Sequence, residues 1–385
     1  MSLRQAWLRE PAALLAGVLF VAALSLQLAR TEGGETHGWF EHPELPLLWL
    51  VGFLAAGGQA LLAPRGTTAG LLLAAACGVA AGAPLSAIAQ HQAEGDVMGV
   101  QAPGLWVFVL GLGFLVWRAL GLLSEAASQR SAPRVLGLLV PALFGLWLVC
   151  LWQVLVTGFG VPSVLLPSPA QIAVVFAAST ATLWADFVQT FLKAVLAGYL
   201  LGCGSGFVVA LLVDRVPFLQ RGLLPLGNFV SALPIVGIAP IMVMWFGFDW
   251  QSKAAVVVIM TFFPMLVNTI AGLHATEAME RDLMRSYAAS YWQTLLTVRL
   301  PNALPFIFNA LKINSTLALI GAIVAEFFGT PIVGMGFRIS TEIGRMNVEM
   351  VWATIAVAAV AGSLFYGLLA LAERATTFWH PSYRR

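Results

Sequence analysis

The chain has 385 residues, of which 59% are hydrophobic and 10% are charged, and its mean hydropathy is +0.87. Soluble domains contain about 25% charged residues, so this composition excludes an ordinary soluble domain and places the chain in a lipid bilayer. A net charge of +2 is too small to indicate nucleic acid as a partner. The three cysteines lie in apolar stretches without metal-ligand spacing, so we expect no disulfide framework and no metal site.

Ten apolar stretches approach the length of about 20 residues that a helix needs to cross a hydrocarbon core of about 30 Å. In chain order they are residues 11–29, 46–63, 69–89, 104–123, 135–157, 189–212, 223–245, 254–273, 304–327 and 350–372. The first stretch has only a weak cleavage pattern behind it, so we expect an uncleaved anchor. The sequence therefore predicts an all-α, polytopic integral membrane protein with about ten transmembrane helices.

The basic residues set the orientation, because Lys and Arg beside a span stay on the cytoplasmic side. With the N-terminus inside, thirteen arginines lie at cytoplasmic span ends, against three arginines and one lysine on the opposite side. An even number of spans then places both termini in the cytoplasm. We therefore expect a multi-pass protein of the cell inner (plasma) membrane, in contact with membrane lipid.

A polar stretch at residues 124–134 combines small and charged residues with a proline, which is typical of a linker. It divides the chain into an N-terminal block of four expected spans, residues 1–130, and a C-terminal block of six, residues 131–385. No sequence repeat relates the two blocks, and the sequence assigns no role to the first.

Several charged or small residues inside the spans predict packing rather than chemistry. Lys193, Arg118 and Lys312 lie near enough to span ends for their charged groups to snorkel to the boundary. Glu326, at the outer end of the ninth expected span, either guards the mouth of a path or is solvated. A row of small residues in the sixth expected span permits close helix packing: Gly198, Gly202 and Gly206.

The long inner loop between the eighth and ninth expected spans carries the most informative pattern. Residues 277–290 predict an amphipathic helix with Met279, Leu283 and Tyr287 on one stripe. This helix alone is equally compatible with a segment that lies in the headgroup region. Its spacing is more specific: Asp282-Leu283-Met284, three residues, Ala288, nine residues, Val298, one residue and Leu300-Pro301.

This spacing resembles the EAA loop of binding-protein-dependent ABC importer permeases, which have Glu-Ala-Ala, Gly, Ile and Leu-Pro at these positions. Here Asp282 replaces Glu, Leu283 and Met284 replace the alanines, and Ala288 replaces Gly. The resemblance spans about residues 135–383 and points to the nitrate/sulfonate/taurine branch, through residues 166–169, 191–199, 245–248, 263–269 and 379–383. Residues 262–269 and 320–329 look closer to members assigned to thiamine-pyrimidine precursors or riboflavin.

The resemblance implies a six-helix type I ABC permease core in residues 131–385, with the EAA loop at residues 277–303. It also implies three partners: a cytoplasmic ABC ATPase, a periplasmic substrate-binding protein and a second copy of the permease. The chain has no P-loop, because none of its three lysines is followed by Ser or Thr. We therefore expect no enzymatic activity and no cofactor in this subunit, with ATP and Mg bound by the ATPase. The implied ATPase-coupling residues are Asp282, Arg285, Ser286, Tyr287 and Ala288, with Leu300 and Pro301 fixing the turn back into the membrane.

The translocation path is expected along the seventh and ninth spans, with help from the eighth. The seventh contains three prolines, and broken helices at membrane depth either line a cavity or mark a packing kink. Polar residues inside spans are costly unless they face a cavity or a partner. The candidate path residues are Ser231, Pro234, Asn268, Asn309 and Asn314. The serine and the three asparagines are each also compatible with a helix-to-helix hydrogen bond.

Other functions are less well supported by the residues. An ion-coupled secondary transporter is the main alternative, but it needs buried carboxylates, and the expected span interiors are nearly free of Asp and Glu. A membrane enzyme is disfavoured because the five histidines are scattered without a metal set. Two solute classes stay open: a small polar organic or anionic solute, or a vitamin precursor such as a pyrimidine or riboflavin.

Overall fold

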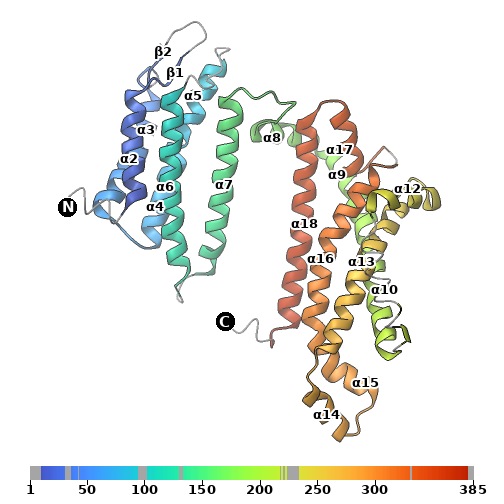
Figure 1. The fold of residues 1–385 in the computed structure, drawn as a ribbon. Coiled ribbons are helices and arrows are strands. Elements are labelled where there is room, and N and C mark those ends of the chain that lie inside the picture. The colour runs from blue at the N-terminus through green and yellow to red at the C-terminus, as the bar shows by residue number, and fades with distance from the viewer. Residues whose placement is uncertain are drawn as a thin grey trace. The chain divides into compact units, whose positions relative to one another are not determined.

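The computed structural model of the chain describes residues 10–30, 36–41, 43–93, 102–129, 133–216, 218–219, 222, 234–329 and 332–379. Their regular structure is helical, apart from one antiparallel pair of short strands, β1 (Ala29–Arg30) and β2 (Thr36–His37) (Figure 1). The prediction of an all-α polytopic membrane protein is confirmed.

The chain folds into two compact units, Met1–Gln171 and Ile172–Arg385. The helix α7 (Arg134–Gly158), which the sequence analysis assigns to the C-terminal block, packs within the first unit, where Val154 joins the buried core. The packing boundary therefore lies after α7. The boundary at residues 130–131 rests on sequence resemblance and stays a prediction.

The first unit is a helical bundle whose core is rich in aromatic rings. Its helices are α2 (Pro11–Ser25), α3 (Glu44–Leu62), α4 (Thr67–Ala80), α5 (Gly82–Ala93), α6 (Pro103–Ala127) and α7. The ring of Phe108 lies 4.9 Å from that of Phe20 and 5.3 Å from that of Trp39. Arg118 of α6 forms an ion pair with the fully buried Glu10. Arg118 therefore does not simply snorkel as expected, because a buried carboxylate requires a partner.

Within the described residues, eight helical segments are long and apolar enough to cross a membrane: Glu44–Leu62, Thr67–Gln92, Pro103–Ala127, Val135–Gly158, Thr180–Arg215, Trp250–His274, Tyr291–Glu326 and Val348–Thr376. They correspond to eight of the ten expected spans. The first expected span is shorter than predicted, because α2 has 15 residues, or about 22 Å at about 1.5 Å per residue. The seventh lies largely outside the described residues. Its described part is α12 (Ile235–Phe246), which begins directly after Pro234.

The second unit is built around α13 (Trp250–His274), which packs against both α10 (Leu196–Arg215) and α16 (Leu300–Glu326). Helix α18 (Val348–Thr376) packs on α16. The expected glycine row lies where α10 meets α13: a Cβ on Gly198 would be 2.6 Å from the Ala254 carbonyl oxygen. The row therefore permits the close approach that the sequence predicts.

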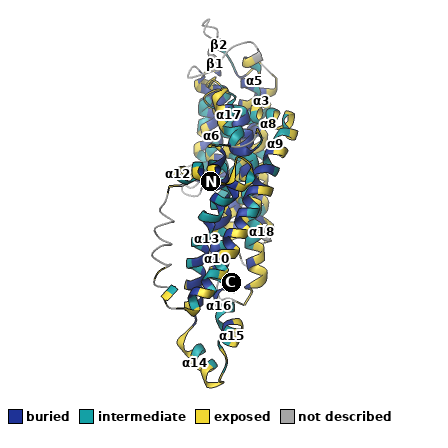
Figure 2. Cartoon of the chain, turned by 90° about the vertical axis from the view of Figure 1, so that its right-hand side faces the viewer, coloured by how far each residue is buried: buried dark blue, intermediate teal, exposed yellow. Residues whose placement is uncertain are grey.

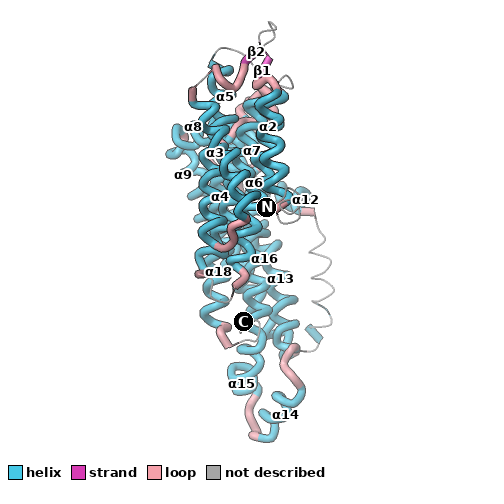
Figure 3. The backbone as a smooth tube through the Cα atoms, turned by 90° about the vertical axis from the view of Figure 1, so that its left-hand side faces the viewer, coloured by secondary structure: helices cyan, strands magenta, loops and turns pink. Residues whose placement is uncertain are grey.

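The two ends of the second unit carry different elements (Figure 1). At one end lie α14 (Ala278–Ser286) and α15 (Tyr291–Thr294), which loops connect to α13 and to each other (Figure 3). The π-helix η3 (Leu295–Arg299) leads from α15 into α16. At the other end lie α17 (Met335–Gly344) and α9 (Thr180–Phe187), and the π-helix η2 (Val188–Val195) joins α9 to α10. The positive-inside pattern predicts that the α14 end is cytoplasmic, and the terms inner and outer are used below in that sense.

Candidate functional site

The inner loop begins with a firmly capped helix. The Glu277 and Glu280 side chains each accept from the other residue's backbone N–H, and this capping box fixes the first turn of α14. Asn302 Nδ2 donates to Glu280 Oε2 at 2.8 Å, which ties the start of α14 to α16. The predicted helix over residues 277–290 is thus present, but it ends at Ser286.

Ala288 ends this helix in a left-handed conformation, with φ of 52°. The Ala288 N–H donates to the Arg285 carbonyl at 2.9 Å and the Ala289 N–H donates to the Met284 carbonyl at 3.0 Å. These two bonds form a Schellman motif, in which the left-handed position is usually Gly. A Gly at this position, as in the EAA pattern that the loop resembles, would therefore have a conformational reason, and Ala288 adopts the left-handed backbone at a cost of about 1–2 kcal/mol.

Replacing Ala288 with Gly should stabilise the end of α14. Relief of the left-handed strain exceeds the added chain entropy of Gly, for a net gain of about 0.5–1 kcal/mol. Hydrogen exchange of the Ala289 amide should then slow by about two- to fivefold. Ala289→Gly is the matched control, because the φ of Ala289 is not positive. That variant should exchange faster, and equal behaviour of the two variants would contradict the assignment.

Most residues of helix α14 are exposed (Figure 2). Met279 is 75% exposed, Leu283 56% and Tyr287 76%, and together they form the predicted stripe, here called the α14 stripe. Beside it, Arg285 pairs with Asp282 at 3.3 Å, with both side chains largely exposed. An exposed apolar row on an otherwise polar helix is a candidate interaction surface.

The base of the loop is fixed by a partly buried cluster, here called the Asp214 clamp: Asp214, Tyr291 and Arg299. Arg299 donates two hydrogen bonds to Asp214, at 2.8 and 2.7 Å, and the Tyr291 hydroxyl donates a third at 2.9 Å. Arg299 also donates to the Leu273 carbonyl at 3.3 Å. The clamp therefore joins the inner ends of α10, α13 and α16. The sequence analysis missed it, although an acidic residue among the arginines of the inner side was a usable signal.

Leu300 and Pro301 lie beyond the reversal of the chain. They begin α16 within the continuous helical segment Tyr291–Glu326, with Pro301 in its first turn. The chain instead turns between α14 and α15, where the left-handed Ala288 stops the first helix. The turn predicted at Leu300 and Pro301 is therefore supplied by residues 287–290.

The candidate path residues make separate contacts. Ser231 lies outside the described residues, and Pro234 stands just before α12. The Asn268 Nδ2 donates to the Pro264 carbonyl at 2.8 Å, and Asn309 is exposed on α16. Asn314 is fully buried and donates to the Thr261 carbonyl at 2.7 Å, a bond between α16 and α13. Asn314 thus occupies the packed interior of the unit, and a common path stays a prediction.

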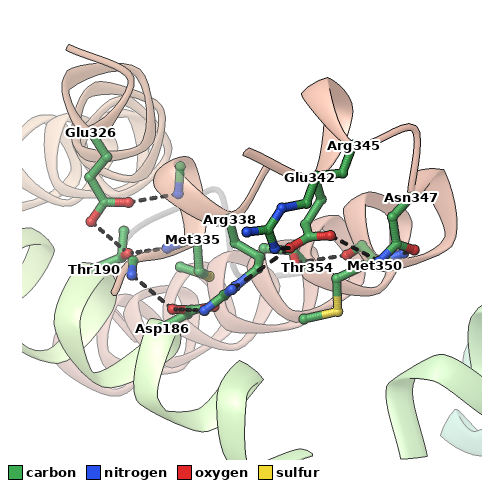
Figure 4. Close-up of polar contacts among 12 residues, drawn as sticks. Asp186, Thr190, Glu326, Met335, Arg338, Glu342, Arg345, Asn347, Met350 and Thr354 are labelled. Carbon is green, nitrogen blue, oxygen red and sulfur yellow. Dashed lines mark hydrogen bonds and ion pairs between the residues drawn. The ribbon is translucent and has the colours of Figure 1, made fainter. Parts of the chain in front are cut away.

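The outer end of the second unit contains a buried polar network (Figure 4). The Thr190 hydroxyl donates to Glu326 at 2.7 Å and accepts from the Met335 N–H at 2.8 Å. The Gly336 N–H donates to the other Glu326 oxygen at 2.6 Å. Because Glu326 is only 2% exposed, the alternative that it is solvated is wrong. The network joins α16 and α17 to η2.

A second part of this network holds α17 to α9. Arg338 donates to the fully buried Asp186 at 2.8 Å, and the Gly334 N–H donates to the same carboxylate at 2.8 Å. Glu342 in turn accepts from Asn347 at 2.9 Å (Figure 4). These bonds connect residues far apart in sequence and fix the outer ends of the helices.

The expectation that the span interiors are nearly free of acidic residues holds only in part. Five carboxylates of the second unit have buried side chains among the described residues: Asp186, Asp214, Glu326, Glu342 and Glu373. Four of them form ion pairs with basic residues, including Glu373 with Lys312 at 2.7 Å. Lys312 is therefore ion-paired rather than simply snorkelling.

Comparison with known proteins identifies the family. Residues 198–378 match the family described as binding-protein-dependent transport system inner membrane component. The riboflavin transport system permease protein RibX of Chloroflexus aurantiacus is 32% identical over 237 residues, which cover 61% of this chain and 88% of RibX. The chain belongs to this family of ABC importer permeases.

Two further relatives of this permease carry other solutes in their names. The formylaminopyrimidine transport permease protein ThiX of Halalkalibacterium halodurans is 32% identical, over 63% of the permease and 96% of ThiX. The taurine transport system permease protein TauC of Escherichia coli is 29% identical, over 52% of the permease and 72% of TauC. The predicted family and branch are confirmed, and the permease is the inner-membrane component of an ATP-driven, binding-protein-dependent importer.

The match with the family contains the whole inner loop, from α14 to the start of α16. The positions at which this permease differs from the EAA pattern therefore lie within the residues that match the family. Leu283 replaces an alanine of that pattern and contributes the middle of the α14 stripe. The stripe is thus bulkier in this permease than the family pattern implies.

Proposed function

We propose that the permease couples to a separate cytoplasmic ABC ATPase through α14. The observation that carries this proposal is the α14 stripe, an exposed apolar row on a capped helix whose base is fixed by the Asp214 clamp. A docking surface that moves together with the helices behind it transmits force, whereas a loosely attached one does not. Asp282, Arg285 and Ser286 form the polar side of this surface, and Tyr287 and Ala288 form its end.

The remaining partners follow from this arrangement. The working importer contains two copies of the permease, two ATPases and a periplasmic substrate-binding protein, with both permease termini in the cytoplasm. ATP and Mg bind to the ATPase, and the permease itself catalyses no reaction. These assignments are supported by the family membership and by the distribution of basic residues.

The transported molecule is a small polar organic or anionic solute. The names of the relatives mention riboflavin, formylaminopyrimidine and taurine. A vitamin precursor of the first two kinds is the second candidate, because residues 262–269 and 320–329 look closer to permeases for such compounds. A candidate path for it runs beside Pro234, Asn268 and Asn309.

Reconstitution in proteoliposomes tests the proposal. With the ATPase inside and the loaded binding protein outside, solute uptake should require ATP and should persist when ionophores remove all ion gradients. Liposomes that contain the permease alone are the control and should take up no solute. Uptake that is independent of ATP and collapses with an ion gradient would instead establish a secondary transporter.

A further inference from the structure

A cavity opens at the end of the second unit opposite α14. It has a volume of about 760 Å³, and its wall includes Gln189, Lys193, Phe248 and Asp249. Small-molecule sites typically have volumes of about 300–1,000 Å³. The cavity is therefore large enough for a small solute.

The π-helix η2 presents two different faces at this end. Thr190 points into the buried outer network, whereas Gln189 and Lys193 line the cavity. A π-helix has i→i+5 hydrogen bonds, is rare, and occurs frequently at functional sites. An eight-residue π-helix beside an open cavity with a few polar side chains in a mostly apolar wall is therefore a reason to ask what the cavity binds.

The polar groups of the cavity form a chain of hydrogen bonds. Lys193 Nζ donates to Gln189 Oε1 at 3.1 Å, and Gln189 Nε2 donates to Asp249 Oδ1 at 2.6 Å. The pKa of the Asp249 carboxyl is lowered, chiefly by this bond from Gln189, so the carboxylate is charged at neutral pH. The Gln189 amide therefore bridges the Lys193 ammonium and the Asp249 carboxylate.

Lys193 differs from the other two lysines of the chain. Lys312 pairs with Glu373, and the buried Lys253 ammonium donates to three backbone carbonyls, those of Phe248, Asp249 and Gly329. Lys193 is exposed and forms no ion pair with a carboxylate of the described residues. An ammonium has three donors, and only one of them is used here. The Lys193 ammonium therefore has two further donors beside the cavity, and it interacts with the Asp249 carboxylate only at longer range.

We propose that this cavity binds a solute with an anionic group, a carboxylate or sulfonate, against Lys193 and a hydrogen-bond donor against Asp249. The proposal rests on the proposed import of a small solute and names its chemical class and its first contact with the permease. Phe248, which is 66% exposed, offers an apolar wall to the body of the solute. An anionic lipid headgroup shares the chemistry of the anionic group, so the test separates the two sources.

Amine acylation of the complete permease measures the accessibility of Lys193 directly, because the chain has only two other lysines. In phosphatidylcholine nanodiscs, an impermeant acylating reagent should modify Lys193 much faster than Lys253 or Lys312, as measured by peptide mass spectrometry. Isethionate, a sulfonate with a hydroxyl donor, should slow this reaction about tenfold at about ten times its Kd. Ethylene glycol, which lacks the anion, should not. Equal effects of the two probes, or an unreactive Lys193, would overturn the proposal.

Two further experiments identify the molecule that binds in the cavity. If phosphatidylglycerol protects Lys193 and isethionate does not, the cavity belongs to lipid and the solute proposal fails. Ethanesulfonate lacks the donor of isethionate, so the permease should bind isethionate more tightly, and Asp249→Asn should abolish this preference. A preference that Asp249→Asn leaves unchanged would contradict the role of Asp249.

Uptake by the assembled importer separates this proposal from the proposed function. Lys193→Met should reduce uptake of an anionic solute at least about tenfold, whereas Lys193→Arg should retain most of the uptake. Unchanged uptake by Lys193→Met would overturn the cavity proposal and leave the importer function standing. Absence of ATP-dependent uptake by the unmodified importer would instead contradict the function itself.

Discussion

Replacing Leu283 with Glu is expected to weaken binding of the ATPase at least about thirtyfold without unfolding the permease. Truncation of a central apolar contact costs about 2 kcal/mol or more, and burial of a carboxylate in its place adds to that loss. The fold should survive, because the Leu283 side chain is 56% exposed and contributes to no described core cluster. Co-purification and a binding titration with the purified ATPase measure the effect.

Phe378→Glu is the matched control for this variant. Phe378 is also an exposed apolar residue, at 70%, and it follows α18 on the same side of the membrane, but it lies outside α14. Its replacement should leave ATPase binding within about twofold of the unmodified permease, since surface substitutions usually change free energies by about 0.5 kcal/mol or less. Equal losses in both variants would show that added negative charge, and not the α14 stripe, determines binding.

The sequence predicted the helices well because their signal is local. An apolar run of about 20 residues is sufficient to identify a span, and the amphipathic pattern of α14 is likewise contained within its own residues. The extent of α14 was less predictable, since it depends on the left-handed Ala288, a conformation that Ala seldom adopts. The position of the turn between α14 and α15 depends on that single residue.

The polar clusters could not be predicted, because their members are far apart in the sequence. Asp214 and Arg299 are 85 residues apart in sequence, and Asp186 and Arg338 are 152 apart. No periodicity or motif specifies such partners, because helix packing decides which charged residues meet. The contacts of Asn314 were unpredictable for the same reason. Its polarity suggested a place along the translocation path, whereas its amide donates a hydrogen bond to the neighbouring helix α13.

We expect the Asp214 clamp to contribute both to the stability of the fold and to the coupling of the ATPase to transport. Asp214 is 2% exposed and Arg299 13%, so both charges are largely removed from water. A buried pair of this kind contributes little net stability when complete, but removal of one partner leaves an uncompensated buried charge. The clamp also joins the loop that carries α14 to the ends of α10 and α13. Its loss should therefore affect both the fold and the transmission of movement.

Asp214→Ala is expected to destabilise the permease by about 3–5 kcal/mol, because Arg299 loses its counter-charge and Tyr291 its acceptor. Unfolding of the detergent-solubilised protein measures this loss. Arg345→Ala is the control: Arg345 is 67% exposed, and without it Glu342 still has Arg338 and Asn347 as partners, so a loss of about 0–1 kcal/mol is expected. The folded fraction of Asp214→Ala should still bind the ATPase through the intact α14 stripe, yet transport less solute per ATP hydrolysed. If that ratio is unchanged, the clamp stabilises the fold only, and coupling runs through other contacts.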